Sequence, residues 1–204
     1  ENILNKIDRI ESVEGRLQLI RILRNNSKIF LDYAHTPEAL EKAILSLREH
    51  FNKKISVIFG CGGERDKSKR KLMGKIASRY CDKIYITDDN PRFENPIKIR
   101  GDIKKGIKKK KIIEISNRAK AIAEAIKNLG TGEILLVAGK GHEKTQDIGS
   151  QKIYFSSVLE VLEASKIGLR CAASDGSCEK VRRTENKYYT WTQIWECVQK
   201  LGKL

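Results

Sequence analysis

The chain has 204 residues, of which 40% are hydrophobic and 33% charged, which is typical of one folded domain with room for a small appendage. No apolar run approaches the roughly 20 residues of a membrane-spanning helix, and the charged start, ENILNKIDRIESVEGR, does not resemble a signal peptide. We therefore expect a soluble, cytoplasmic protein with no membrane partner, and the first residue, Glu1 rather than methionine, indicates a fragment of a longer one.

The formal net charge of +15 raises the question of nucleic-acid binding, because clustered Lys and Arg side chains bind phosphate backbones. The basic residues are spread widely, however, and the densest run, KKGIKKKK at 104–111, has no aromatic residue that could stack on a base. We interpret this run as a solvated turn and expect no nucleic acid as partner. A basic nucleic-acid-binding module remains the alternative from another functional class, and a positive domain would also attract anionic nucleotides.

The five cysteines lack the CxxC spacing of zinc ligands, and their number is odd. We expect reduced thiols and no metal site.

Short apolar runs alternate with helical patterns along most of the chain. In chain order, we predict a strand at 29–33, a helix at 37–50, a strand at 55–60, a helix at 69–80, a strand at 83–89, a helix at 97–107, a strand at 111–116, a helix at 118–129, a strand at 133–139, a short edge strand at 152–155 and a helix at 157–166. This order predicts an α/β, Rossmann-like domain with a mostly parallel sheet of about six strands flanked by helices.

Polar loops follow four of the predicted strands, with the sequences DYAHTP (32–37), GCGGERDK (60–67), TDDNPR (87–92) and GKGHE (139–143). Parallel strands joined by right-handed crossovers place their carboxyl ends on one edge, where ligands bind. We therefore expect the four loops to form one site.

The residue types in these loops favour a ligand that carries both carboxylates and ammonium groups. Arg65 and Arg92 have planar guanidinium groups that can bind a carboxylate with two hydrogen bonds. Glu143 and Asp89 could hold an ammonium group.

Other residues of the loops have alternative interpretations. Gly62 and Gly63 would let the backbone approach a ligand, or would serve only the turn. Asp32 could accept a hydrogen bond from a ribose hydroxyl with His35 beside it, although either residue could instead cap the helix that begins near Pro37.

Four segments, DYAHTPEAL, FGCGGERDKSKR, TDDNPRFENP and AGKGHEKTQ, resemble in order and spacing the signatures of the MurE-type Mur ligases, over about 14–166. The resemblance implies the C-terminal domain of such a ligase, with a diaminopimelate site. The residues that it assigns to diaminopimelate are Arg65, Asn90, Arg92, Gly139 and Glu143, with Asp89 and Pro91 completing the tetrad DNPR that marks diaminopimelate rather than lysine. It also implies that Asp32 and His35 border the nucleotide and that Gly15 and Arg16 form a hinge to a central domain.

The resemblance further implies an ATP- and Mg²⁺-dependent ligase that adds meso-diaminopimelate to UDP-N-acetylmuramoyl-L-alanyl-D-glutamate in peptidoglycan synthesis. The chain contains no G-x-x-x-x-G-K-S/T phosphate loop, which the family carries in its central domain. We therefore expect no catalytic residue here, and no activity without the missing N-terminal and central domains. A lysine-adding Mur ligase and a folylpolyglutamate synthetase-like domain are the alternatives within the superfamily.

We divide the chain into the end of a central domain with its hinge (1–16), the C-terminal domain (17–166), a linker (167–187) and an extra helix (188–204). In the last segment, Trp191, Ile194, Trp195 and Val198 have helical spacing. This segment faintly resembles the start of a MurF-type ligase, which would make it the beginning of another domain.

Overall fold

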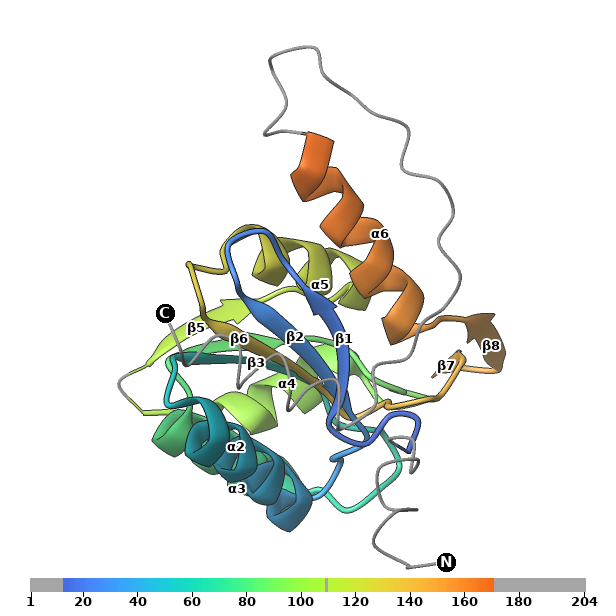
Figure 1. Ribbon diagram of the computed structural model, residues 1–204. Coiled ribbons are helices and arrows are strands. Elements are labelled where there is room, and N and C mark those ends of the chain that lie inside the picture. Colours follow the sequence, from blue (N-terminus) through green and yellow to red (C-terminus); the bar gives the residue numbers. More distant parts are fainter. Residues whose placement is uncertain (1–12, 109, 171–204) are drawn as a thin grey trace, which may run out of the picture.

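The computed structural model describes residues 13–108 and 110–170 (Figure 1), so our predictions for 1–12, 171–187 and 188–204 lie outside the described residues. Its elements are, in chain order, β1 (Gln18–Ile22), β2 (Lys28–Asp32), α2 (Pro37–Phe51), β3 (Ile55–Phe59), α3 (Ser68–Tyr80), β4 (Lys83–Ile86), α4 (Pro96–Lys104), β5 (Lys111–Glu114), α5 (Arg118–Lys127), β6 (Ile134–Ala138), β7 (Thr145–Ile148), β8 (Gln151–Tyr154) and α6 (Ser157–Arg170). Strand and helix alternate from β2 to β6, as predicted.

One sheet of six strands organises the fold, in the order β1-β2-β6-β3-β4-β5. Five of the strands are parallel to one another, and β1 pairs antiparallel with β2 at one edge. The predicted α/β class with a mostly parallel sheet of about six strands is therefore confirmed.

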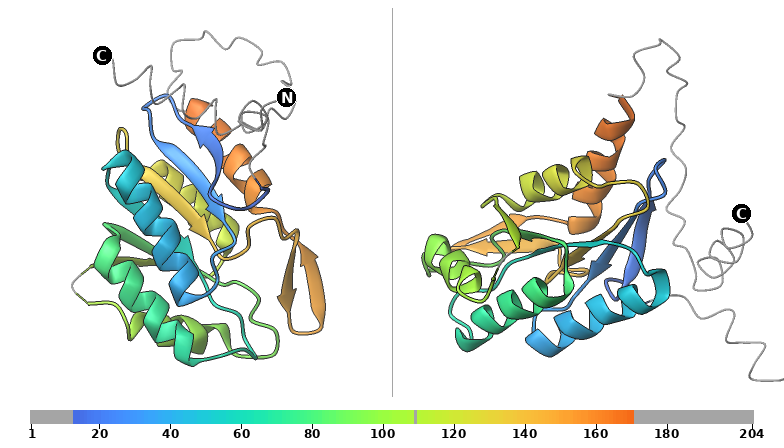
Figure 2. Two further views of the ribbon diagram at one scale, coloured as in Figure 1. Left: turned by 60° about the horizontal axis from the view of Figure 1, so that its bottom comes forward. Right: turned by 90° about the vertical axis from the view of Figure 1, so that its left-hand side faces the viewer.

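Helices cover both faces of the sheet, with α2, α3 and α4 on one side and α5 and α6 on the other (Figures 1 and 2). The central strand β6 serves both cores, because successive side chains of a strand point to opposite faces. Ile134, Leu136 and Ala138 pack with the first helical layer, whereas Leu135 and Val137 pack with the second.

The sixth strand is not the one that we predicted. We did not predict β1. The last three of its five residues are only partly buried, and its register against β2 is irregular. A strand does form where we predicted one at 152–155, but its predicted place at the edge of the main sheet was wrong, because β8 pairs with β7 in a separate hairpin that projects from the domain (Figure 2). Its apolar residues Ile153 and Tyr154 stay exposed.

Several helices begin with a capping side chain. Thr36 accepts a hydrogen bond from the Ala39 N–H at the start of α2, where Pro37 occupies the first turn as predicted. Asn95 and Asn117 cap α4 and α5 in the same way. Within the described part of the chain, no helix combines the length and apolar character needed to cross a bilayer.

Candidate ligand site at the carboxyl edge of the sheet

The four polar loops follow β2, β6, β3 and β4, which are neighbours in the sheet and parallel. Their carboxyl ends therefore lie side by side at one edge, as expected for an α/β sheet. Two glycines allow the loops to approach one another. At Gly63 a Cβ atom would lie 1.9 Å from the Pro91 carbonyl oxygen, and at Gly139, which has a φ of +109°, it would lie 3.0 Å from Asp89 Oδ2.

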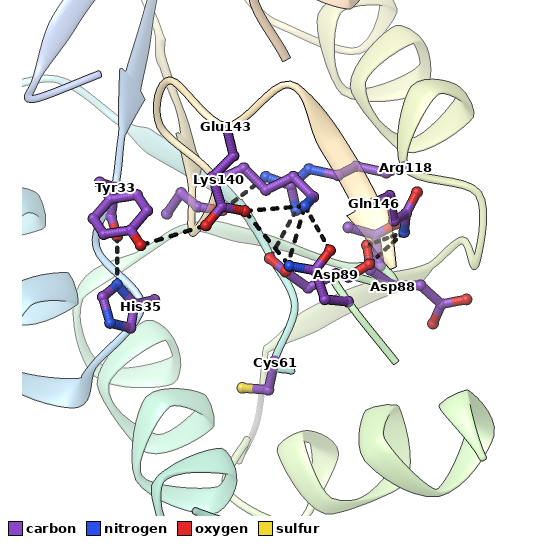
Figure 3. A network of polar contacts seen from close by, with 12 residues as sticks. Tyr33, His35, Cys61, Asp88, Asp89, Arg118, Lys140, Glu143 and Gln146 are labelled. Atoms are coloured by element: carbon purple, nitrogen blue, oxygen red, sulfur yellow. Dashed lines mark hydrogen bonds and ion pairs between the residues drawn. The ribbon is translucent and has the colours of Figure 1, made fainter. Parts of the chain in front are cut away.

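Lys140 lies at the centre of the site (Figure 3), and its side chain has no exposure to solvent. The ammonium group donates to Asn90 Oδ1 at 2.8 Å, to the Thr145 carbonyl oxygen at 2.7 Å and to Glu143 Oε2 at 3.3 Å. These acceptors belong to the loop after β4, to the loop after β6 and to β7. One buried cation therefore joins the segments that form the site.

The Asp89 carboxylate lies between two buried cations. Its Oδ1 is 3.8 Å from Lys140 Nζ and its Oδ2 is 4.0 Å from Arg118 Nη1. Burial lowers the pKa of the Arg118 guanidinium, and the charge of Asp89 opposes that change. Asp89 thus faces the ammonium group of the chain's own Lys140.

Arg92 is fixed to two neighbouring segments. It has a left-handed φ of +51°, its N–H donates to the Asp147 carbonyl oxygen at 3.1 Å, and its carbonyl oxygen accepts from the Gly149 N–H at 2.8 Å. Its Nη1 donates to the Gly63 carbonyl oxygen at 2.8 Å. These contacts hold the guanidinium group beside the loop after β3.

The glycines of the loop after β3 approach protein rather than open space. A Cβ atom at Gly62 would lie 3.1 Å from Arg92 Nη1 and 3.7 Å from Arg65 Cγ, so the two arginines flank this glycine. Arg65 is exposed. Gly63 contacts the loop after β4. Its N–H donates a hydrogen bond to the Asn90 carbonyl oxygen at 2.9 Å.

A second buried arginine, Arg70 of α3, holds the loop after β3. Arg70 donates to both carboxylate oxygens of Glu94 at 2.7 Å and to the Gly62 carbonyl oxygen at 3.2 Å, and its side chain is fully buried. Hydrogen bonding to Arg70 lowers the pKa of Glu94 to about 2. Arg70 of α3 therefore links the loop after β3, through the Gly62 carbonyl oxygen, to the loop after β4, through Glu94.

Aromatic side chains form the other half of the edge, around Tyr33. Its ring has the Arg16 guanidinium at 4.9 Å, the His35 ring at 4.7 Å and the His142 ring at 5.6 Å. The Tyr33 hydroxyl donates to Glu143 Oε1 at 3.3 Å, which links the two halves. Burial, reinforced by the Glu143 charge, raises the pKa of Tyr33.

Asp32 and His35 do not cap α2, so that alternative was wrong: Thr36 does so instead. The buried Asp32 carboxylate accepts from the Leu17 N–H at 2.6 Å and from the Ala34 N–H at 2.7 Å. It therefore fixes the chain that follows Gly15 to the end of β2. His35 is exposed, with Nδ1 2.9 Å from the Tyr33 carbonyl oxygen.

Two further observations concern nucleophilic and metal-binding groups near the loops. Cys61 is buried below the loops, 3.7 Å from the Met73 sulfur, and burial raises its pKa to about 12. Such a thiol is a poor nucleophile at neutral pH. Among the described residues, no group of three or more His, Cys, Asp or Glu side chains is placed to hold a metal ion.

Residues 15–141 match the family model described as Mur ligase, glutamate ligase domain. The chain belongs to the Mur ligase family. It is 47% identical over 169 residues to a UDP-N-acetylmuramoyl-L-alanyl-D-glutamate–2,6-diaminopimelate ligase of Rickettsia conorii, covering 82% of this chain and 34% of the relative. The ligase of the same name from Coxiella burnetii is 42% identical over 165 residues, which is 80% of this chain and 34% of that protein.

Solved structures agree with this membership. A ligase with the same name has a TM-score of 0.72 at 35% identity and covers 81% of this chain and 34% of its own. A bifunctional folylpolyglutamate synthase/dihydrofolate synthase from Yersinia pestis, complexed with AMPPNP and Mn ion, has a TM-score of 0.51 at 19% identity, over 63% of this chain and 28% of that one, which shows a shared fold. The chain spans about a third of the length of the curated relatives that it matches.

As a Mur ligase domain, the chain places most of the residues assigned by resemblance around Lys140. Asn90 and Glu143 contact it directly, Asp89 faces it, and Gly139 gives Asp89 room.

Among the described residues of this Mur ligase domain, sequence reasoning missed three cations whose side chains have no exposure to solvent, Lys140, Arg118 and Arg70. Arg118 had a detectable signal, because it shares the apolar face of α5 with Ile122 and Ala125 at i+4 and i+7.

Proposed function

We propose that the chain is the amino-acid-binding domain of an ATP-dependent ligase that joins meso-diaminopimelate to UDP-N-acetylmuramoyl-L-alanyl-D-glutamate. The observation that carries the proposal is the convergence of Asn90, Arg92 and Glu143 at one edge of the sheet, in a chain 47% identical to a ligase of that name. Cations and amide donors next to a partly exposed carboxylate suit a ligand with carboxylates and ammonium groups.

In this proposal, Arg92 and Arg65 bind a carboxylate of diaminopimelate, and Glu143 accepts a hydrogen bond from an ammonium group. Glu143 is suited to this role because a third of its side chain is exposed, whereas Asp89 is directed at Lys140 and Arg118. Pro91 shapes the backbone between Asn90 and Arg92, and Gly139 leaves space for the Asp89 carboxylate. The domain orients the attacking amine, and orientation of this kind can lower a barrier by about 7–11 kcal/mol.

The aromatic half of the edge fits the border of a nucleotide site. The Tyr33, His35 and His142 rings lie together there with the Arg16 guanidinium, and such groups suit contact with a base or with phosphates. ATP with Mg²⁺ would supply the phosphoryl group that activates the D-glutamate carboxylate, so that amide formation releases ADP and phosphate. We place the Mg²⁺ ligands outside the described residues, and movement about Gly15 and Arg16 would close the two halves of the enzyme.

Titration of the 204-residue chain with meso-diaminopimelate and with L-lysine, by calorimetry or by ligand NMR, tests the proposal. We expect tighter binding of diaminopimelate, because lysine lacks the second carboxylate. Equal affinities would indicate the lysine-adding alternative. A salt-dependent shift of DNA in a gel, with no amino-acid binding, would indicate a nucleic-acid-binding module instead.

A further inference from the structure

The Lys140 side chain is fully buried, and its ammonium group has an acceptor for each of its donors. An ammonium group has three N–H bonds, and Asn90 Oδ1, the Thr145 carbonyl oxygen and Glu143 Oε2 lie within 2.7–3.3 Å of Nζ. No donor remains for a ligand. Any effect of Lys140 on binding must therefore act through the groups that it holds.

The first of these groups is the Asn90 amide, whose orientation is determined by its neighbours. Its Oδ1 accepts from Lys140 Nζ at 2.8 Å and from the Asp147 N–H at 3.1 Å, which uses both lone pairs. The reversed amide would set its NH₂ group against two donors and lose both hydrogen bonds. Asn90 is thus restricted to presenting Nδ2, a donor, to the site, and a donor recognises an acceptor such as a carboxylate.

The second group is the Glu143 carboxylate. Its Oε2 lies 3.3 Å from Lys140 Nζ, and its Oε1 accepts from the Tyr33 hydroxyl at 3.3 Å (Figure 3). The same Oε2 lies 3.5 Å from Asn90 Nδ2. A carboxylate has about four lone-pair positions, so Glu143 retains capacity to accept from a ligand ammonium. A donor for a carboxylate and an acceptor for an ammonium group are therefore held side by side.

We propose that Lys140 is the positioning residue that makes this site selective for the amino-acid end of its ligand. Its ammonium group orients the Asn90 amide donors toward the ligand and holds Glu143 beside them. The inference rests on the proposed function and deepens it, because it names a residue that sets the preference for diaminopimelate over lysine. The side-chain end of lysine carries an ammonium group for Glu143 but no carboxylate for Asn90.

The test compares the ¹⁵N-labelled 204-residue chain with two variants, Lys140→Met and Lys144→Met. Lys144 is exposed on the same loop, so the second variant makes the same chemical change without touching the site. The first measurement needs no ligand. We expect the Asn90 side-chain amide signals to shift, and their proton exchange to accelerate, in Lys140→Met but not in Lys144→Met.

The second measurement is the dissociation constant of each protein for meso-diaminopimelate and for L-lysine. Loss of a hydrogen bond to a charged group corresponds to a change of about 10- to 150-fold in affinity. We expect a loss of this size for diaminopimelate in Lys140→Met and a much smaller one for lysine. A merely structural role of Lys140 would weaken both ligands equally, and that result would overturn the proposal, as would unchanged Asn90 signals.

The two measurements separate this inference from the proposed function. If the wild-type chain binds neither amino acid but Asn90 responds to Lys140→Met, the proposed function fails while the positioning of Asn90 by Lys140 is supported. If Lys140→Met does not fold, NMR of the wild-type chain alone still tests whether Lys140 holds Asn90. Its Lys140 Nζ protons must exchange slowly and show contacts to the Asn90 side chain, and a freely exchanging ammonium group would overturn the inference.

Discussion

The backbone and side chain of Arg92 are fixed by different neighbours. The backbone is hydrogen-bonded to Asp147 and Gly149 of the β7–β8 hairpin, and Nη1 is hydrogen-bonded to the Gly63 carbonyl oxygen. Because few rotamers satisfy both, the guanidinium group is placed before a ligand arrives. Binding then requires little further loss of side-chain entropy, which favours affinity.

Replacement of Arg92 by alanine should therefore weaken binding of diaminopimelate by about 10- to 150-fold, the range for a hydrogen bond to a charged group. Lysine, which lacks the second carboxylate, should be affected far less. Calorimetric titration of the variant with both amino acids measures the difference. Arg24→Ala, in the exposed turn between β1 and β2, is the matched control. If the variant loses the same affinity for both ligands, Arg92 does not bind the second carboxylate of diaminopimelate.

Gly139 is the residue whose replacement tests the close approach of Asp89. Its φ of +109° is unfavourable for other residues, and a Cβ atom would lie 3.0 Å from Asp89 Oδ2. We expect Gly139→Ala to lower the free energy of unfolding by about 3 kcal/mol, the upper end of the range for a strained backbone conformation, because the added methyl group also crowds Asp89. Urea denaturation measures this change.

Gly132 provides the control, because it has a φ of +70° and no atom within 4 Å of a Cβ position. Gly132→Ala should lower the free energy of unfolding by only about 1–2 kcal/mol, the cost of the left-handed backbone conformation for a residue with a side chain. If the two variants lose the same stability, the contact between residue 139 and Asp89 is unimportant.

At the scale of elements, the β7–β8 hairpin depends on the loop that it covers. An isolated two-stranded hairpin is only marginally stable in water, and the four residues of β8 are all exposed. The contacts of Arg92 with the hairpin, together with the hydrogen bond from Gln146 Nε2 to the Asp89 carbonyl oxygen, attach it to the domain. The hairpin and the loop after β4 should therefore become ordered together.

The ion pair of Arg70 with Glu94, which joins α3 to the segment before α4, gives the stability a pH dependence. The pKa of Glu94 is lowered from an ordinary value of 4.5 to about 2 in the folded state. A lowered folded-state pKa stabilises the protein above pH 4.5, and this contribution is lost as the pH falls toward 2.

Denaturation at several pH values should thus show wild type more stable than Glu94→Gln at pH 7, with a difference that shrinks between pH 4.5 and 2. Glu163→Gln provides the control, because Glu163 is exposed on α6. A difference that stays constant with pH would argue against ionisation of Glu94 as the cause.

At the scale of the whole molecule, we expect no catalysis by the 204-residue chain alone. It has no G-x-x-x-x-G-K-S/T loop to hold the phosphates of ATP. Phosphate release, measured with ATP, Mg²⁺, diaminopimelate and the UDP-linked dipeptide, should equal that of a protein-free blank. The full-length Coxiella burnetii ligase serves as the positive control. Substrate-dependent phosphate release by the chain would contradict this expectation.

The sequence alone determined the fold class and the location of the candidate site. Apolar runs such as ILLVA in β6 predicted a central strand buried on both faces, and β6 has that position. Polar loops after four predicted strands predicted a shared edge, because the geometry of parallel strands fixes where their ends meet. These inferences succeeded because an unbroken apolar run is a local pattern and because the meeting of parallel strand ends follows from sheet geometry.

Only the tertiary structure decided which polar groups are buried and which strand closes the sheet. Lys140 and its partner Asn90 are 50 residues apart in sequence, and Arg118 and Asp89 also come from separate elements. A buried charge is stable only with partners and hydrogen bonds around it, and no local pattern contains those partners. For the same reason β1 and β8 were misjudged: whether a short strand pairs with the sheet or projects from it depends on neighbours that only the folded chain supplies.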